Sequence, residues 1–404
     1  MKNIKMLIPN GVNEFQCIGN RCEDNCCSNW SIHVDKPTYK KYRNLNDKQM
    51  KSMLEKSVKR NRKSTSDYDY AKIKLNEDGT CPLMLCDKLC YIHKNLGEEH
   101  LCSTCKTYPR QYNIINGIIE KNLTLSCPEV ARIILLNENG IDFYFEENTD
   151  ELSKEYVKSK NTNLESLKTI GAKYFWELRT FVIEILQDRT LSIEERLVML
   201  GMFINKLDEN ITYEKLIDLI KEYQTYRHNE TFKGVLNKFN YNYNYNLQFI
   251  THMSNSTLKT KNMEYINIMK KTAEGLKFKI DDVDSSVIYK EGIDNEYRNF
   301  KNSYEYILEN YLVNYVYKSL FLVNKKNPLD CYAELVVKFS MIKLNLIGIS
   351  KYNQQKLTKE DAVNIIYSFS RFADHDRYVL KNIIEYLEVN QLKTLPHMVS
   401  LIGE

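Results

Sequence analysis

Apolar residues in the second part of the chain recur at steps of three and four, which is the pattern of an amphipathic helix. Three stretches carry it: KYFWELRTFVIEILQDRT at 173–190, TYEKLIDLIKEYQ at 212–224 and NSYEYILENYLVNYVYKSLFLV at 302–323. Only 13 Gly and 7 Pro occur in the whole chain, and a scarcity of helix breakers favours long helices. We therefore predict packed antiparallel helices over residues 151–404.

Helix starts are also marked in this region. Ser192 stands three residues before Glu195, the spacing of a capping box, ahead of the apolar run RLVMLGMFINKL. Thr358 and Asp361 give a second start signal for DAVNIIYSFSRFA, and YVLKNIIEYLEV follows. These signals predict helices that begin just after Ser192 and just after Thr358.

The first third of the chain has a different character. Ten of the 11 cysteines lie between Cys17 and Cys127, and five of the 7 prolines precede residue 130. The predicted fold class is mainly α, with a turn-rich, Cys-rich metal-binding N-terminal domain over residues 1–150 followed by a helical domain over residues 151–404. The remaining cysteine, Cys331, is predicted to be a buried apolar side chain.

Composition and charge limit the partners and the cellular location that we expect. The 57 basic residues are nearly matched by 53 acidic ones, and a net charge of +4 does not favour a nucleic-acid partner. No segment approaches the ~18 uninterrupted apolar residues of a membrane span, and the first residues lack the apolar core of a signal peptide. We therefore predict no transmembrane segment and a cytoplasmic location, where clustered cysteines bind metal more often than they form disulfides. Peripheral membrane association, through the basic residues 51–63, and a homo-oligomer both stay open.

The clustered cysteines fall into four groups with short internal spacings. In chain order the groups are Cys17, Cys22, Cys26 and Cys27; Cys81, Cys86 and Cys90; Cys102 and Cys105; and Cys127. Thiolates a few residues apart can bind one ion from a single turn, because little chain entropy is lost in closing the loop. Four thiolates from separate turns can surround Zn²⁺ or an iron–sulfur cube. The adjacent side chains of Cys26 and Cys27 diverge, so one can bind while the other packs or serves a second centre.

Spacing alone does not decide between zinc and iron–sulfur. Structural zinc sites are common and tolerant of spacing, but ten clustered cysteines exceed what one such site needs. The C-x3-C-x2-C pattern of radical-SAM enzymes is absent. A two-cysteine redox relay at Cys102 and Cys105 also stays open, although a thioredoxin-like βαβ context is missing.

These cysteine segments, together with parts of the helical region, resemble a known family. The resemblance runs through FQCIGNRCEDNCCSNWSIHVDKPTYKKY, CPLMLCDKLCYIHKNLGEEHLCSTCKTYPR and EKNLTLSCPEVAR. It continues in RTLSIEERLVMLGMFINKLDE, ENYLVNYVYKSLF and YSFSRFADHD. These segments are distributed over nearly the whole chain. They are similar to the flagellin lysine-N-methylase family, often called FliB.

The resemblance implies a cytosolic enzyme that transfers methyl groups from S-adenosylmethionine to surface lysines of flagellin. It also implies a [4Fe–4S] cluster held by the cysteine motif, with zinc as the alternative metal. The cysteines on the family pattern, and therefore the expected metal ligands, are Cys17, Cys22, Cys26, Cys27, Cys81, Cys90, Cys102, Cys105 and Cys127. They exceed the ligands of one cluster, so the binding subset and a second centre stay open. Cys86 is off the pattern and is treated as an extra.

The sequence assigns no catalytic residue and no residue that binds the methyl donor. No G-x-G occurs anywhere in the chain, so a Rossmann-type donor loop is not visible. Two other functions stay open, namely a non-enzymatic zinc- or iron-binding interaction module on a helical scaffold and a metal-trafficking or redox-sensing protein. Of the three functions, only the methylase is expected to transfer a methyl group to lysine.

Overall fold

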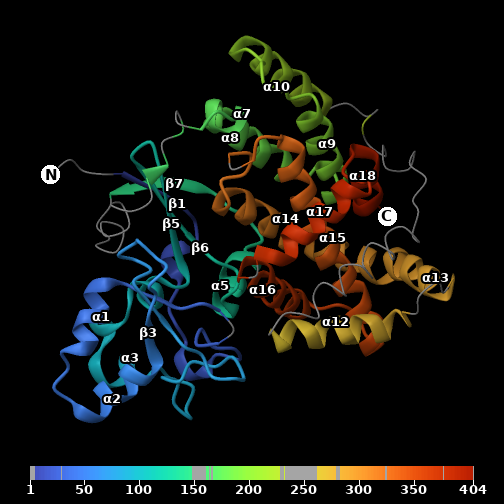
Figure 1. The fold of residues 1–404 in the computed structure, drawn as a ribbon. Coiled ribbons are helices and arrows are strands. Elements are labelled where there is room, and N and C mark those ends of the chain that lie inside the picture. Colours follow the sequence, from blue (N-terminus) through green and yellow to red (C-terminus); the bar gives the residue numbers. More distant parts are fainter. Residues whose placement is uncertain are drawn as a thin grey trace.

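A computed structural model describes residues 5–28, 30–147, 161–162, 164, 167–227, 232, 262–278, 283–323, 325–375 and 377–403. Over these residues the fold is mainly helical, as predicted. Helices from the second part of the chain form one large body, and a β-sheet lies along its side (Figure 1). None of the helices described is long and apolar enough to cross a membrane.

The larger sheet, as far as it is described, has five strands in the order β7-β1-β6-β5-β8. The strands are β1 (Lys5–Pro9), β5 (Arg110–Ile115), β6 (Ile118–Leu123), β7 (Phe143–Glu147) and β8 (Asn161–Thr162). β5 and β6 form an antiparallel hairpin, and β1 pairs in parallel with β6. At the hairpin turn both Asn116 and Gly117 have positive φ, 46° and 85°, which is the backbone of a tight hairpin loop.

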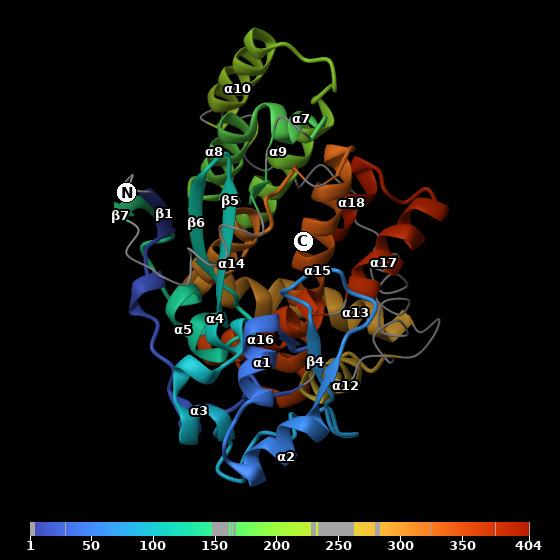
Figure 2. The same cartoon turned by 60° about the vertical axis from the view of Figure 1, so that its left-hand side comes forward.

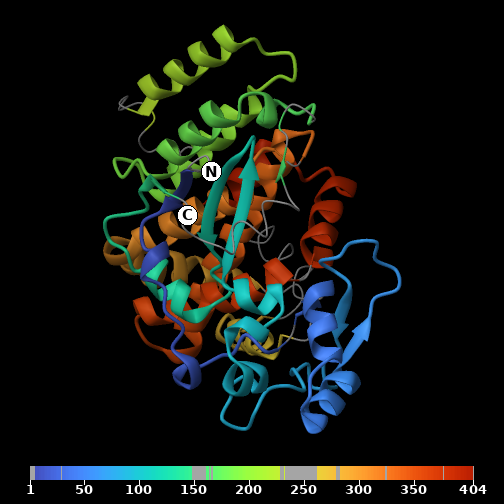
Figure 3. The same ribbon diagram turned by 90° about the vertical axis from the view of Figure 1, so that its left-hand side faces the viewer.

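A smaller lobe surrounds a three-stranded sheet of order β2-β4-β3 within the described residues (Figure 3). Its strands are β2 (His33–Val34), β3 (Val58–Arg60) and β4 (Ala71–Ile73). Its helices are α1 (Lys36–Arg43), α2 (Lys48–Ser57), α3 (Tyr91–Leu96) and α4 (Ser103–Thr107). The lobe has its own apolar core, and Cys27, Cys81 and Cys102 are part of it.

The helical body is organised around one long buried helix, α15 (Pro328–Asn353), which packs against α9, α12, α16 and α18. The helices of the body are α7 (Ile170–Lys173), α8 (Phe175–Leu186), α9 (Ile193–Asn205), α10 (Tyr213–Arg227), α12 (Met263–Gly275), α13 (Val283–Gly292), α14 (Arg298–Lys318), α16 (Lys359–His375), α17 (Arg377–Val389) and α18 (Leu395–Ile402). α5 (Pro128–Leu135) follows the cysteine region and packs against α14 and α16 (Figure 2).

The closest helix crossing in this body, between α12 and α15, depends on glycine. A Cβ at Gly348 of α15 would lie 2.5 Å from Cγ2 of Thr272, and a Cβ at Gly275 would lie 2.2 Å from the carbonyl oxygen of Gly348. Real Cβ atoms do not approach other atoms this closely, so larger residues would push the two helices apart.

The helices predicted from apolar periodicity are confirmed as α8, α10 and α14. The capping box is also confirmed, because the Ser192 Oγ accepts from the Glu195 N–H at 3.3 Å and the Glu195 carboxylate accepts from the Ser192 N–H at 2.8 Å. At α16, the Thr358 Oγ accepts from the Asp361 N–H at 3.1 Å. Cys331 is buried, as predicted.

The two-domain division at residue 150 stays a prediction, because residues 148–160 lie outside the described part of the chain. The larger apolar core contains residues from both sides of that position, for example Leu125 and Val130 together with Leu178 and Val336. The two sheets, whose strands lie in the first 147 residues except for β8, were not predicted from the sequence pattern. The turn-rich character of this region is therefore only part of its structure.

A buried ion pair joins the larger sheet to the helical body. The guanidinium of Arg179 on α8 donates to both carboxylate oxygens of Glu120 on β6, at 3.0 and 2.5 Å. The side chains are 4% and 0% exposed, and the Arg179 guanidinium also lies over the Phe175 ring. Burial raises the pKa of Glu120, and the contact with Arg179 opposes that shift.

We expect Arg179→Met to lower the free energy of unfolding by about 3–5 kcal/mol at neutral pH, because it leaves the Glu120 carboxylate buried without a partner. Since the pKa of Glu120 is already raised by burial, the loss should shrink as the pH falls and the carboxyl takes up a proton. Urea unfolding of both proteins at several pH values measures this. A loss that does not change with pH would contradict the assignment to Glu120.

The matched control is Arg298→Met, which removes an exposed pair with Asp294 at 3.2 Å, where the two side chains are 54% and 41% exposed. This change should cost no more than ~1 kcal/mol.

Candidate functional site

The structure brings six of the nine predicted metal ligands to one cavity of about 390 Å³. The six that line it are Cys17, Cys22, Cys26, Cys27, Cys90 and Cys127. Cys81 and Cys102 lie instead in the core of the small lobe, with Cys105 packed against it. Cys86 is exposed and does not line the cavity, in keeping with its treatment as an extra.

Three of these thiols form a hydrogen-bonded series. Cys27 donates toward the sulfurs of Cys26 and Cys90, and these contacts raise its own pKa. The same hydrogen bonds lower the pKa of Cys26 and bring that of Cys90 to about 6. The hydrogen bonds from Cys27 therefore favour the thiolate form of the two flanking residues, and the thiolate is the form of sulfur that binds soft metals.

The other thiols form two further sets. Cys102 and Cys105 are hydrogen-bonded to each other, and this contact raises the pKa of Cys105. Cys22 and Cys127 share the cavity wall with Cys17, and burial raises the pKa of Cys22 and brings that of Cys127 to about 12. Each set supplies sulfur donors, but the sets come from different turns of the chain.

Sulfur donors suit zinc or an iron–sulfur cluster chemically. In the part of the chain that the structure describes, however, no three His, Cys, Asp or Glu side chains are arranged to hold one metal ion. The thiols are brought near one another as pairs and a series rather than as a closed ligand set. Which of the nine cysteines bind a metal therefore stays a prediction.

The CEDNCC loop is fastened to the helical body by Arg371 of α16. One guanidinium nitrogen forms an ion pair with Asp24, and the other donates to the carbonyl oxygens of Asn25 at 2.6 Å and Ser28 at 2.8 Å. The Arg371 side chain is 6% exposed. A buried cation with this many partners fixes the loop backbone on either side of Cys26 and Cys27.

The loop is also held from its other flank. The indole N–H of Trp30 donates to the carbonyl oxygen of Cys26 at 2.7 Å, and its ring packs on Tyr108 at a centroid distance of 5.3 Å. Tyr108 and Arg371 both line the thiol cavity. The wall of the cavity is thus built from the small lobe and from α16 together.

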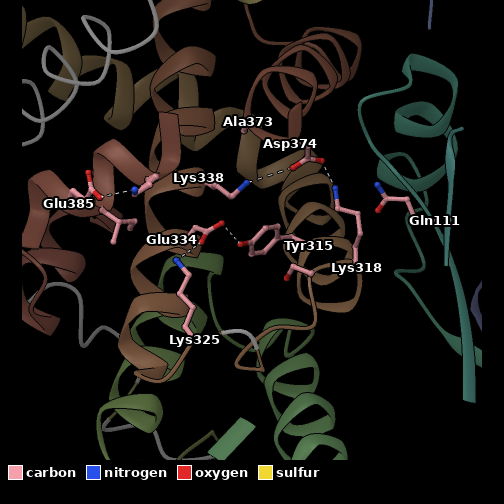
Figure 4. A pocket seen from close by; sticks show the side chains of 12 residues that line it. Gln111, Tyr315, Lys318, Lys325, Glu334, Lys338, Ala373, Asp374 and Glu385 are labelled. Atoms are coloured by element: carbon pink, nitrogen blue, oxygen red, sulfur yellow. Dashed lines mark hydrogen bonds and ion pairs between the residues drawn. The ribbon is translucent and has the colours of Figure 1, made fainter. Parts of the chain in front are cut away.

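A second cavity, of about 540 Å³, lies between β5, α14, α15, α16 and α17. Besides the pair of Lys381 and Glu385 on α17, at 3.4 Å, its charged residues form two groups (Figure 4). In one group, Asp374 of α16 pairs with Lys318 of α14 and, at 3.7 Å, with Lys338 of α15. In the other, Glu334 of α15 accepts from the Tyr315 hydroxyl at 2.8 Å and from Lys325 at 3.0 Å. Sequence reasoning missed this cavity.

A chain of hydroxyl groups joins the two cavities. The Tyr108 hydroxyl lies 3.3 Å from Ser126 Oγ, which lies 3.2 Å from Thr124 Oγ. The Thr124 hydroxyl donates to Asp374 at 3.5 Å. Ser126 and Thr124 are both buried, so this polar path runs through the interior between the thiol cavity and the lysine–carboxylate cavity.

Two signals for the second cavity were present in the sequence. Lys338 stands inside the apolar run ELVVKFSMI, where a cation is out of place unless it has a partner. Asp374 belongs to YSFSRFADHD, one of the segments that carry the family resemblance. Neither signal indicates that the two side chains meet, because they lie on different helices.

Comparison with known proteins identifies a matching family model and several similar proteins. Residues 179–401, more than half of the chain, match the family model of the FliB lysine N-methylase C-terminal domain. A protein of Salmonella choleraesuis (strain SC-B67) named "Lysine-N-methylase" is 26% identical over 408 residues, covering 96% of each chain. A protein of the same name from Salmonella typhimurium is 25% identical over the same shares.

A third relative covers less of the chain. The "Flagellar biosynthetic protein FliU" of Salmonella muenchen is 35% identical over 136 residues, which are 33% of this chain and 79% of the relative. No solved structure matches the chain significantly.

We expect Arg371→Met to lower the free energy of unfolding by about 3 kcal/mol, because Asp24 and two loop carbonyls lose a buried partner. The released loop should also let a thiol reagent label Cys26 and Cys27 faster, as peptide mapping of the purified protein would measure. Arg298→Met, whose exposed pair with Asp294 lies outside the cysteine region, is the control and should leave the labelling rate unchanged. Equal labelling rates in Arg371→Met and the unaltered protein would contradict the role given to Arg371.

Proposed function

We propose that this chain, which belongs to the FliB lysine N-methylase family and is a protein-lysine N-methyltransferase, transfers methyl groups from S-adenosylmethionine to surface lysines of flagellin. Relatives of nearly equal length that bear the name lysine-N-methylase support the reaction, and the flagellar name of the third relative supports the substrate. The observation that carries the proposal is the Arg371 contact. It ties the CEDNCC loop to α16, which lies inside the region matched by the methylase family model.

The reaction sets a clear chemical requirement. A lysine ε-ammonium has a pKa near ~10.4, and it must lose its proton before the nitrogen has a lone pair to attack with. In a polar transfer, that lone pair forms the new N–C bond as the C–S bond of the sulfonium breaks. S-adenosylhomocysteine leaves with the bonding electrons, and the proton lost from the ammonium passes to a base or to water. The enzyme must therefore desolvate the acceptor amine and align it with the methyl group.

The proposal includes an iron–sulfur cluster at the thiol cavity. Cys26, Cys27 and Cys90 would supply ligands there, because their sulfur atoms form one hydrogen-bonded series in which the contacts with Cys27 lower the pKa of Cys26 and Cys90. When bound, a [4Fe–4S] cluster supplies a one-electron redox centre and a rigid cross-link between the cysteine segments. With zinc in its place, the same cysteines would form a structural knot.

Metal analysis tests the cluster. After anaerobic purification, we expect roughly four irons with matching sulfide and a broad absorption near ~400 nm. Cys→Ser changes at Cys26, Cys27 and Cys90 should each lose the metal, whereas Cys331→Ser, at a buried cysteine outside the cavity, should retain it. Full iron content in all three variants would exclude these ligands, and stoichiometric zinc without iron would exclude the cluster.

The methyl transfer is tested with purified flagellin and S-adenosylmethionine under reducing, oxygen-free conditions. We expect lysine-containing flagellin peptides to gain the mass of methyl groups, and no gain without S-adenosylmethionine. Methylation of an unrelated lysine-rich protein at the same rate would contradict flagellin as the specific substrate. No methylated peptide under any of these conditions would contradict the proposed reaction.

A further inference from the structure

We infer that the lysine–carboxylate cavity between β5, α14, α15, α16 and α17 binds the amino-acid end of the methyl donor, S-adenosylmethionine. This inference rests on the proposed function, because it supplies the donor site that the sequence does not assign. The cavity volume of about 540 Å³ is within the usual range for sites that hold small ligands.

The charges around the cavity fit a zwitterion. Four of its lining residues are lysines, at 318, 325, 338 and 381, and three are carboxylates, at 334, 374 and 385. The charges form three mixed groups on the wall (Figure 4). Asp374 pairs with both Lys318 and Lys338, so this group has one more cation than anion, whereas Glu334 pairs with Lys325 and Glu385 with Lys381. An α-amino acid carries a carboxylate and an ammonium a few bonds apart, so its carboxylate can interact with the lysines near Asp374 while its ammonium interacts with Glu334.

The same charges disfavour other ligands. A nucleotide phosphate or free phosphate would meet the lysines but would be repelled by Asp374 and Glu334. The ammonium of an acceptor lysine, which brings no anion with it, would face the excess positive charge of a lining with four lysines and three carboxylates. A ligand with one group of each sign avoids both penalties.

Hydrogen-bonding capacity remains for such a ligand. The Lys318 ammonium has three donors and pairs with Asp374, so donors remain for a ligand carboxylate. Glu334 accepts from Tyr315 and Lys325, and its two oxygens have further lone pairs for a ligand ammonium. Both side chains are mostly buried, with exposures of 11% for Lys318 and 19% for Glu334. Their electrostatic interactions are therefore screened less by water than those at the surface.

The rest of the cavity can hold the nucleoside. Ala373 and Ile384 contribute apolar surface, and Gln111 on β5 faces the Lys318 ammonium across the opening (Figure 4). A side-chain amide both donates and accepts, which is what the edge of an adenine base requires. The uncharged lining residues of the cavity are Gln111, Tyr315, Ser319, Ala373 and Ile384.

Calorimetric titration of the purified full-length protein with S-adenosylhomocysteine, the unreactive product, tests the site. We expect Lys318→Met and Glu334→Gln each to weaken binding by tenfold or more, which corresponds to about 1.4 kcal/mol. The matched controls are Lys206→Met and Glu222→Gln, which break an exposed ion pair of 2.9 Å on α9 and α10. These controls should bind as the unaltered protein does, and circular dichroism checks that every variant is folded.

Ultraviolet cross-linking of labelled S-adenosylmethionine to the unaltered protein gives a second readout that needs no variant. Labelled peptides should come from 315–338 or 373–385. Undiminished binding in both cavity variants, or labelling confined to other peptides, would overturn the inference while leaving the proposed function standing. Displacement of S-adenosylhomocysteine by inorganic pyrophosphate, but not by methionine, would assign the cavity to phosphate ligands and overturn the inference as well. An unaltered protein that binds neither compound and methylates no flagellin would overturn the proposed function itself.

Discussion

The cysteine region depends on one buried cation, the guanidinium of Arg371. The loop around Cys26 and Cys27 is short of apolar side chains, so burial alone cannot fix its path. Arg371 replaces that missing packing with an ion pair to Asp24 and hydrogen bonds to the carbonyls of Asn25 and Ser28. A guanidinium can do this because it presents five N–H donors in one rigid plane. Burial of the Arg371 charge is unfavourable unless all of these partners are in place. The contacts that hold the loop therefore form together.

Because Arg371 lies on helix α16, its contact with the thiol loop also bears on the lysine–carboxylate cavity. Arg371 and Asp374 are three residues apart and therefore neighbours on the helix surface, yet one contacts the thiol loop and the other the lysine–carboxylate cavity. The hydroxyl series from Tyr108 through Ser126 and Thr124 reaches the same Asp374 from the other side. A shift of α16 would alter both cavities together. One helix and a buried polar path therefore connect the two cavities.

The sequence predicted what depends on local pattern. Apolar periodicity located α8, α10 and α14, and the capping box located the start of α9. Six of the nine cysteines singled out in the sequence line one cavity. The sequence did not predict the larger sheet, whose strands are short, although the Asn116–Gly117 pair between apolar residues is a hairpin signal. Nor could it predict the Arg371 contacts, since Arg371 lies 343 residues from Ser28. Such pairings depend on how helices pack, and no local spacing records them.

A donor site lined with lysines raises the question of why the enzyme does not methylate itself. An amine can attack the sulfonium only when it is unprotonated. Burial lowers the pKa of Lys338, which by itself would favour the reactive amine, but Asp374 and Glu334 oppose that shift. Lys318 shares Asp374, and Lys325 pairs with Glu334. The carboxylates of the cavity thus have two effects. They give a zwitterionic ligand its complementary charge, and they oppose the loss of a proton from Lys338, whose ammonium form lacks the lone pair that methyl transfer requires.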